Sequence, residues 1–273
     1  MKHAPFDVVR ADPPGPVVVE VPHAGLEIDP VSAAFTVLPR EAERTDAPRA
    51  DADLGADAIW LGSEARGVTR VVARTHRYVI DLNTNPRPGP APPFYEEDPA
   101  PRPTIRRSAA GPSWLEPALP REEVARRVRE IFDAYHDAID RELERSREAH
   151  GRAVLVASHT FPEAPGVSAD VVVGTAEGRT LGAELREVIV DVLRAAGLTV
   201  VVEAPFPGGF SITRHARLAE GVGAVQLELA RRLVVEPDRP RTVSAAAVER
   251  LGRVADAMAT ALTDCIAQGR ARS

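Results

Sequence analysis

The sequence predicts an α/β protein in which helices cover a largely parallel or mixed β-sheet. Short apolar runs, most of them rich in valine, alternate along the chain with longer helical stretches, and this order is typical of layered α/β domains. The chain has 273 residues, of which 44% are hydrophobic and 27% charged, as in an ordinary globular protein. A chain of this size can bury the core that such a fold needs.

Seven strands are expected where four to six consecutive residues are mainly apolar or β-branched. These are residues 17–21, 68–73, 78–82, 153–157, 170–173, 199–202 and 224–229.

Four helices are expected, three between these strands and one after the last, at about residues 50–65, 121–149, 178–196 and 243–268. The second is the clearest, because its apolar residues recur at spacings of three and four and form one stripe. The stripe consists of Val124, Val128, Ile131, Phe132, Tyr135, Ile139 and Leu143.

Residues 84–120 break the alternation, because they are dense in proline and have no clear period. A loop of this length within a compact domain is more often functional or disordered than a simple connection. Strands are expected on both sides of it, and no repeat or change in composition divides the chain. We therefore expect one domain over residues 1–273 that carries this loop.

Composition excludes several classes of function. The net charge of −6 gives no general electrostatic case for binding nucleic acid or an anionic membrane. No run approaches the ~18 apolar residues of a membrane span and the N-terminus has no apolar signal segment, so a cytoplasmic location is the default expectation. The single Cys265 excludes an intramolecular disulfide. Without a glycine-rich phosphate loop or a GxSxG turn, nucleotide binding and serine-type hydrolysis have no support.

Two histidines follow apolar runs and form a candidate metal site with an aspartate. His23 comes directly after VVVEVP and His159 directly after AVLVAS, at strand ends of the kind that build sites in open α/β sheets. Zinc, the common choice for imidazole and carboxylate ligands, often has three such ligands in catalytic sites. We favour Asp53 as the third, since the neighbouring Gly55 allows close approach of the backbone. The other candidates, which could instead be helix N-caps, are Asp46, Asp51 and Asp57.

Glu228 is the candidate general base. In the run VQLEL, residues 225–229, alternation places Gln226 and Glu228 on one face of a strand and apolar residues on the other. A buried carboxylate is costly unless a cation or a donor network accepts it. Near a metal, Glu228 would accept a proton from activated water and pass it to a leaving nitrogen. Its structural alternative is an ion pair with an arginine such as Arg214.

Two further residues are candidates for substrate binding. The motif PGG at residues 207–209 precedes Arg214, whose guanidinium fork suits a substrate carboxylate. Asn83 follows the apolar run 78–82, and its amide can donate a hydrogen bond to a carboxylate or an oxyanion.

The motifs PHAG, DADLGAD, RYVIDLN, SHT and GGFSITRH…VQLELA occur in this order along the chain. With them the sequence resembles the N-formylglutamate amidohydrolase family over roughly residues 17–232. The resemblance implies a three-layer α/β/α, phosphorylase/hydrolase-like fold with a mixed central sheet, shared with zinc carboxypeptidases. It also implies functional residues: His23, Asp53 and His159 would hold one zinc ion, Glu228 would be the general base, and Asn83, Arg214 and His215 would line the substrate pocket.

Two positions depart from the family pattern. Thr84 stands where the family usually has an arginine that would bind a substrate carboxylate, and Ala157 stands where it tends to have an acid that supports the metal ligands. The candidate substitutes for the missing arginine are Arg87, Arg106 and Arg107.

The expected activity is zinc-dependent removal of an N-acyl group, such as formyl, from an amino acid or a related small amide. A carboxypeptidase-like peptidase on the same fold is one alternative. An inactive homologue that binds metal is the other, and the departures at Thr84 and Ala157 motivate it.

Overall fold

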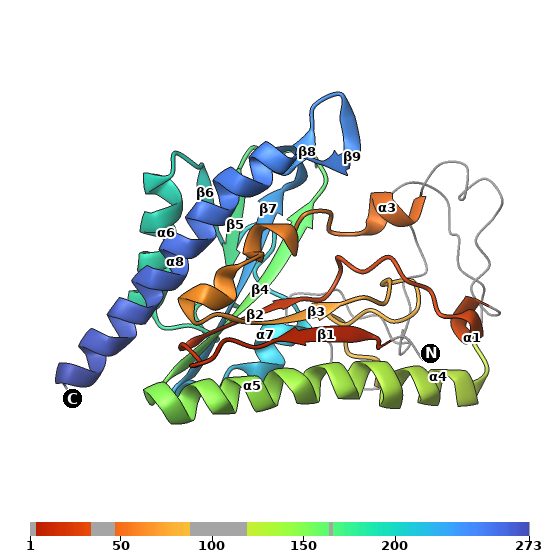
Figure 1. Ribbon diagram of the computed structural model, residues 1–273, viewed down its shortest axis with the longest axis horizontal. Coiled ribbons are helices and arrows are strands. Elements are labelled where there is room, and N and C mark those ends of the chain that lie inside the picture. The colour runs from red at the N-terminus through yellow and green to blue at the C-terminus, as the bar shows by residue number, and fades with distance from the viewer. Residues whose placement is uncertain (1–3, 34–46, 88–118, 164–165, 273) are drawn as a thin grey trace.

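The computed structural model describes residues 4–33, 47–87, 119–163 and 166–272 (Figure 1). Most of the proline-rich segment lies outside the described residues, as do Asp46, Arg106 and Arg107. Seven strands form one sheet in the order β1-β3-β2-β4-β7-β5-β6. Their bounds are β1 Phe6–Val9, β2 Val17–Val21, β3 Thr69–Ala73, β4 Ala153–Phe161, β5 Val171–Gly174, β6 Val200–Val202 and β7 Val222–Ala230.

Both strand directions occur in this sheet. The central strands β3, β2, β4 and β7 are parallel to one another, and β6 is parallel to β5. Strand β1 is antiparallel to β3, and β5 is antiparallel to β7. The sheet is therefore mixed, as the sequence predicts.

Helices cover both faces of the sheet (Figure 1). On one face α6 (Ala183–Ala195) and α8 (Ala245–Arg272) pack on a core that includes Val19, Val156 and Val225. On the other face lies a long helical rod, made of α4 (Arg121–Arg127), a π-helical stretch (Val128–Asp133) and α5 (Ala134–His150). The rod and α7 (Phe210–His215) pack on the second core, which includes Val18, Leu155 and Ala224. The three-layer α/β/α architecture is confirmed.

The remaining elements are short. A hairpin of β8 (Val235–Glu236) and β9 (Arg239–Val243) precedes α8. The others are α1 (Pro30–Ala33), α3 (Ala47–Asp51) and the 3-10 turns Ala58–Trp60, Ser63–Arg66, Leu218–Glu220 and Arg231–Leu233.

The strand expected at residues 78–82 is wrong. Its apolar side chains are buried as predicted, but its backbone bonds with side chains and with the preceding turn rather than with a neighbouring strand. Arg127 Nη1 donates to the Val79 carbonyl at 2.6 Å, and His136 Nε2 donates to the Leu82 carbonyl at 3.0 Å. An apolar run shows that a segment is buried and leaves open which groups satisfy its backbone.

The continuous helix expected at residues 50–65 is also wrong. The segment consists of the end of α3, a series of turns and two 3-10 turns. Gly55 and Gly62 both have φ of +81°. This left-handed conformation, which glycine adopts readily, interrupts a right-handed helix at both positions.

His159 lies within a strand rather than after one. Strand β4 continues to Phe161, because it pairs with β7 along its full length, from Ala153 opposite Val222 to Phe161 opposite Ala230. Within this register His159 lies directly opposite Glu228, and both side chains therefore lie on the same face of the sheet.

Candidate metal centre and active site

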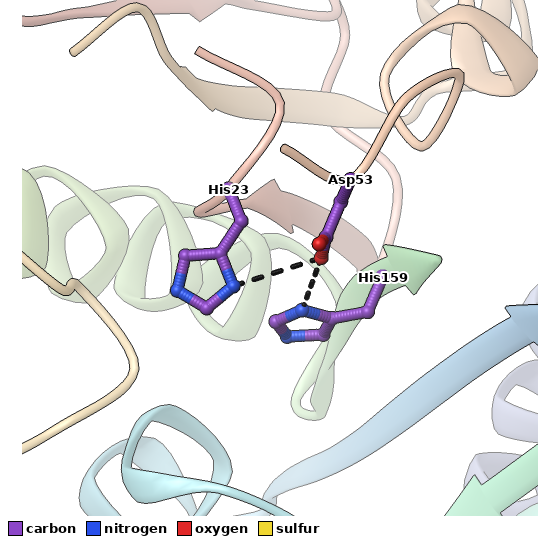
Figure 2. A group of neighbouring side chains, drawn as sticks. All are labelled: His23, Asp53 and His159. Carbon is purple, nitrogen blue, oxygen red and sulfur yellow. Dashed lines mark hydrogen bonds and ion pairs between the residues drawn. The ribbon is translucent and has the colours of Figure 1, made fainter. Parts of the chain in front are cut away.

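His23, Asp53 and His159 converge from three distant parts of the chain, and Figure 2 shows both imidazoles turned toward the carboxylate. His159 Nδ1 lies 2.8 Å from Asp53 Oδ2, and His23 Nδ1 lies 3.6 Å from the same oxygen. One potential ligand atom from each residue lies within 4.8 Å of the others. All three side chains are buried. Two imidazoles and one carboxylate are a donor set that suits zinc.

Two sets of hydrogen bonds fix the backbone near Asp53. The Asp53 amide donates to the His23 carbonyl at 2.9 Å, which joins the segment after α3 to the end of β2. Arg231, directly after β7, donates to the carbonyls of Ala50 and Ala52 at 2.6 and 2.8 Å. Asp53 is therefore held by the two strand ends that flank β4.

Asp81 and Arg77 interact with two of the candidate metal ligands, His23 and Asp53. His23 Nε2 donates to Asp81 Oδ1 at 3.0 Å, so the unprotonated Nδ1 of this tautomer points toward Asp53. Arg77 Nη2 donates to Asp81 Oδ2 at 3.0 Å, and its Nη1 lies 3.8 Å from Asp53 Oδ1. A carboxylate behind a histidine is the usual support of a metal ligand.

Carboxylates outnumber guanidiniums around the candidate site. Among the described residues, the buried Asp53 and Asp81 and the partly buried Glu228 all act on the charge of Arg77. A second guanidinium, that of Arg231, acts on Asp53. Since Asp53 also lies beside two imidazoles, the residues present fit a metal ion in their chemistry.

Glu228 is oriented by a network that includes Gln226, a residue to which the sequence analysis gave no role. Gln226 Nε2 donates to Glu228 Oε1 at 3.0 Å. Gln226 Oε1 accepts from the Gly209 amide at 2.8 Å and from Asn83 Nδ2 at 3.2 Å. A backbone N–H can only donate, so Gly209 fixes the orientation of the Gln226 amide. The alternation in VQLEL, which places Gln226 beside Glu228, was the available signal.

Asn83 connects the two halves of the site. Its Oδ1 accepts from the Ser211 amide at 2.9 Å, which turns its Nδ2 toward Gln226 and to 3.4 Å from His159 Nε2. A Cβ atom at Gly209 would lie 2.2 Å from the Asn83 side chain. Glycine at this position therefore permits the close approach of the PGG loop to Asn83.

The electrostatics of the three central groups are coupled. Burial disfavours the ionised form of Asp53, but the hydrogen bond with His159 and the proximity of His23 outweigh it and hold its pKa well below the ordinary value. Burial raises the pKa of Glu228 to about 7, against the opposing effect of the His159 charge. Burial acts to lower the pKa of His159, yet the Glu228 charge and the Asp53 hydrogen bond raise it to about 9. Glu228 is thus close in energy between its two protonation states near neutral pH, as suits an acid–base group.

Arg214 and His215 lie on α7 and interact with residues outside the candidate metal centre. The exposed Arg214 has its Nη2 3.5 Å from Asp140 Oδ2. The His215 side chain is fully buried, and its ring nitrogens lie 2.8 Å from Asp140 and 2.8 Å from His136. With both ring nitrogens bonded to protein groups, His215 presents none to a substrate in this conformation.

The competing aspartates have other partners or positions. Asp51 accepts a hydrogen bond from the Tyr78 hydroxyl. Asp57 is the residue before the first 3-10 turn. Of the aspartates proposed from the sequence that the structure describes, Asp53 is the one that meets both histidines.

The two departures from the family pattern have structural contexts. Thr84 is exposed, and Arg87 is engaged with Asp133 at 2.6 and 2.7 Å and lies over the Phe132 ring. Ala157 lies directly opposite the fully buried Glu20 of β2. An acid from the neighbouring strand therefore lies at the level of Ala157 and on the same face of the sheet.

Fold and site together are those of a three-layer α/β protein with a buried candidate metal centre at one edge of its sheet. Residues 15–235 match the family model described as N-formylglutamate amidohydrolase. This match spans most of the chain, and the chain belongs to the N-formylglutamate amidohydrolase family.

Individual relatives agree with this assignment. The N-formylglutamate deformylase of Pseudomonas putida is 32% identical over 235 residues, covering 83% of this chain and 84% of the relative. The protein of the same name from Pseudomonas aeruginosa is 29% identical over 233 residues, covering 82% and 84%.

Solved structures share the fold. The crystal structure of N-formylglutamate amidohydrolase from Ralstonia eutropha has a TM-score of 0.81 at 24% identity and covers 98% of this chain and 100% of its own. A gene product of Agrobacterium tumefaciens has a TM-score of 0.70 at 21% identity and covers 96% of each chain. Within the described residues, no helix combines the length and hydrophobicity needed to cross a membrane.

Proposed function

We propose that this chain is a zinc-dependent amidohydrolase that removes the formyl group of N-formylglutamate or of a closely related N-acyl amino acid. The observation that carries the proposal is the convergence of His23, Asp53 and His159 beside Glu228, which lies opposite His159 in the sheet. Family membership and the names of the two Pseudomonas relatives support the choice of reaction.

The metal would be held by His23 Nδ1, an Asp53 carboxylate oxygen and a ring nitrogen of His159. When bound, zinc supplies Lewis acidity, which polarises an amide carbonyl and lowers the pKa of water. Asp81 keeps the proton of His23 on Nε2, and so keeps Nδ1 free to act as a ligand.

Glu228 is the proton carrier in this proposal. Its carboxylate takes a proton from the attacking water and delivers it to the departing amine nitrogen, so that a neutral amine leaves. Gln226 holds Oε1 of Glu228 in place, and burial brings the pKa of Glu228 to about 7. Formate and the free amino acid are the products.

Arg214 and Asn83 are the proposed substrate contacts among the described residues. Arg214 is exposed on α7 and can bind a carboxylate, while the Asn83 amide nitrogen lies near the reacting groups. His215, placed in the substrate pocket by the resemblance, is better suited to hold α7 from within. The cytoplasmic location expected from the sequence stays a prediction.

A substrate panel tests the reaction. Purified chain with measured metal content is incubated with formylated and acetylated amino acids and with dipeptides, while acid and amine release are followed together. Equal release of formate and glutamate from N-formylglutamate supports the proposal. Preferential cleavage of dipeptides would support a carboxypeptidase-like enzyme, and no hydrolysis by metal-loaded protein would support an inactive homologue.

The variant Glu228→Gln tests the general base. We expect turnover to fall about 10²- to 10⁴-fold, because the amide cannot carry the proton. Metal content should not change, since Glu228 is not a proposed ligand. The matched control is Glu220→Gln, at a side chain that is 65% exposed and pairs with Arg217. Full activity in Glu228→Gln would show that another group is the base.

A further inference from the structure

A chain of hydrogen bonds runs from the surface of α5 to the turn that carries Asn83. Asp140 Oδ1 lies 2.8 Å from His215 Nδ1, His215 Nε2 lies 2.8 Å from His136 Nδ1, and His136 Nε2 lies 3.0 Å from the Leu82 carbonyl. Both imidazoles are fully buried, and the Asp140 side chain is 38% exposed. None of these groups belongs to the proposed metal ligands.

The number of protons on this chain follows from the bonding capacity of its members. The Leu82 carbonyl can only accept, so His136 Nε2 carries a hydrogen. The ionised Asp140 carboxylate can also only accept, so His215 Nδ1 carries one. A third hydrogen must lie between His136 Nδ1 and His215 Nε2, because the lone pairs of two unprotonated nitrogens 2.8 Å apart would repel each other. Two imidazoles that share three hydrogens carry one positive charge.

The surroundings place that charge on His215. Its partner Asp140 also lies 3.5 Å from Arg214 and 3.4 Å from Arg217, and burial is outweighed by the His215 hydrogen bond and these charges, which lower the pKa of Asp140. His136 packs against the rings of Phe132 and Phe210, which also contact each other. Burial, together with the positive charges of His215 and Arg214, lowers the pKa of His136 well below its ordinary value.

The chain ends at a turn that serves both sides of the candidate site. Leu82 lies between Asp81, which holds His23, and Asn83, which bonds with Gln226. The Asn83 carbonyl also accepts from the Phe210 amide at 3.3 Å. Since His215 is the last residue of α7, the same chain joins α5, α7 and this turn.

We propose that His136 and His215 together hold one permanent positive charge, balanced by Asp140, and that this charged chain is a positioning device for the Leu82–Asn83 turn. Asp140 is thus a positioning residue that acts on this turn through His215 and His136. Only the consequence for turnover rests on the proposed function; the charge and the position of Asn83 are independent of it.

The charge is measured on the wild-type protein by ¹⁵N NMR of labelled histidine side chains at pH about 7, where an unperturbed histidine with a pKa of about 6.5 is mostly neutral. We expect His215 to carry hydrogens on both ring nitrogens and His136 to be neutral with its hydrogen on Nε2. Neutral rings at both positions would overturn the proposal, and no variant that might misfold is needed.

The positioning role is tested with Asp140→Asn and with the matched control Asp137→Asn, an exposed acid on the same helix. Loss of the charge at position 140 should leave His215 neutral and break one bond of the chain. We expect the side-chain amide signals of Asn83 and Gln226 to shift in Asp140→Asn and to stay unchanged in Asp137→Asn.

For the enzyme, we expect kcat in Asp140→Asn to fall about 10-fold or more at unchanged metal content, because small misplacements of reacting groups are costly. Amide signals that match those of Asp137→Asn would refute the positioning role. A wild-type protein with the expected histidine and amide signals but without hydrolysis would refute the proposed function and leave this inference intact.

Discussion

At the scale of single residues, the orientation of each reactive group depends on a partner distant in sequence. Glu228 receives its hydrogen bond from Gln226, and Gln226 is fixed in turn by the amide of Gly209 and by Asn83. A backbone amide at the origin of this network makes it rigid, because the donor cannot rotate away.

The variant Gln226→Glu tests this network. The new carboxylate keeps an acceptor for Gly209 and Asn83 but removes the donor to Glu228 and places a negative charge beside it. We expect kcat to fall about 10-fold or more, with the acidic limb of the pH–rate profile moved to higher pH, since a neighbouring charge raises the pKa of Glu228. Steady-state kinetics across pH measures both effects.

Gln268→Glu is the control, at an exposed position on α8. If Gln226→Glu has the kinetics of this control, Gln226 does not orient the base.

Residue patterns indicated the candidate metal ligands better than the residues that bond with them. His23, Asp53 and His159 lie together in the structure, and each stands beside a feature visible in sequence, an apolar run or a glycine. Asp81, Arg77 and Arg231 also lie in or beside apolar runs, but this did not reveal what they bond with. Their roles depend on which segments lie side by side, and that is decided by strand pairing.

At the scale of elements, the segment that bears Asp53 is fixed from outside rather than by its own secondary structure. It was expected to be helical, yet two glycines interrupt it, and the guanidinium of Arg231 holds its carbonyls. The strand end of β7 therefore determines where the carboxylate lies.

Replacing Arg231 with methionine should weaken metal binding. We expect zinc affinity to fall about 10- to 100-fold, the range typical of residues that support metal ligands. Competition with a chromogenic chelator measures it. Arg253→Met is the control, because this side chain is 66% exposed and its ion pair with Glu249 contributes little. Equal zinc affinities in the two variants would mean that the hydrogen bonds of Arg231 are not needed for metal binding.

The buried pair of Glu123 and Arg127 fixes the segment at residues 78–82, which the apolar pattern had suggested to be a strand. Arg127 Nε donates to Glu123 Oε1 at 2.6 Å, and its Nη1 donates to the Val79 carbonyl at 2.6 Å. Arg127→Met leaves the Val79 carbonyl unpaired and leaves the buried Glu123 with Arg126 as its guanidinium partner. It should therefore lower the free energy of unfolding by about 3 kcal/mol. Urea denaturation measures it.

This contribution depends on pH. Burial of Glu123 is outweighed by hydrogen bonds from Arg126 and Arg127, which lower its pKa. The stabilisation is therefore complete above the ordinary glutamate pKa of about 4.3 and is lost as the pH falls further through the lowered value. The difference in stability between wild type and Arg127→Met should narrow at acidic pH, and the part due to the hydrogen bond with the Val79 carbonyl should remain. The control is Arg129→Met, at an exposed position. If Arg127→Met loses as little free energy of unfolding as this control, the account is contradicted.

At the scale of the whole molecule, parallel pairing of β2, β4 and β7 brings the candidate site together. Val17 lies opposite Val154 and Ala153 opposite Val222, so the three strands end at one edge of the sheet, where His23, His159 and Glu228 lie. The order of strands and helices along the chain was enough to predict the layers. It was not enough to predict the order β2-β4-β7, which depends on contacts between residues far apart in sequence, such as Val17 with Val154 and Ala153 with Val222.

We propose that this edge of the sheet holds one zinc ion through His23, Asp53 and His159. The most direct measurement is the zinc bound per chain after reconstitution and dialysis, in wild type, Glu228→Gln and His159→Gln. We predict one zinc ion per chain in wild type and in Glu228→Gln. His159→Gln should lose most of its zinc, while its circular dichroism spectrum shows that the fold is retained. A wild-type protein that retains no zinc, or a His159→Gln variant that retains as much as wild type, would contradict the claim.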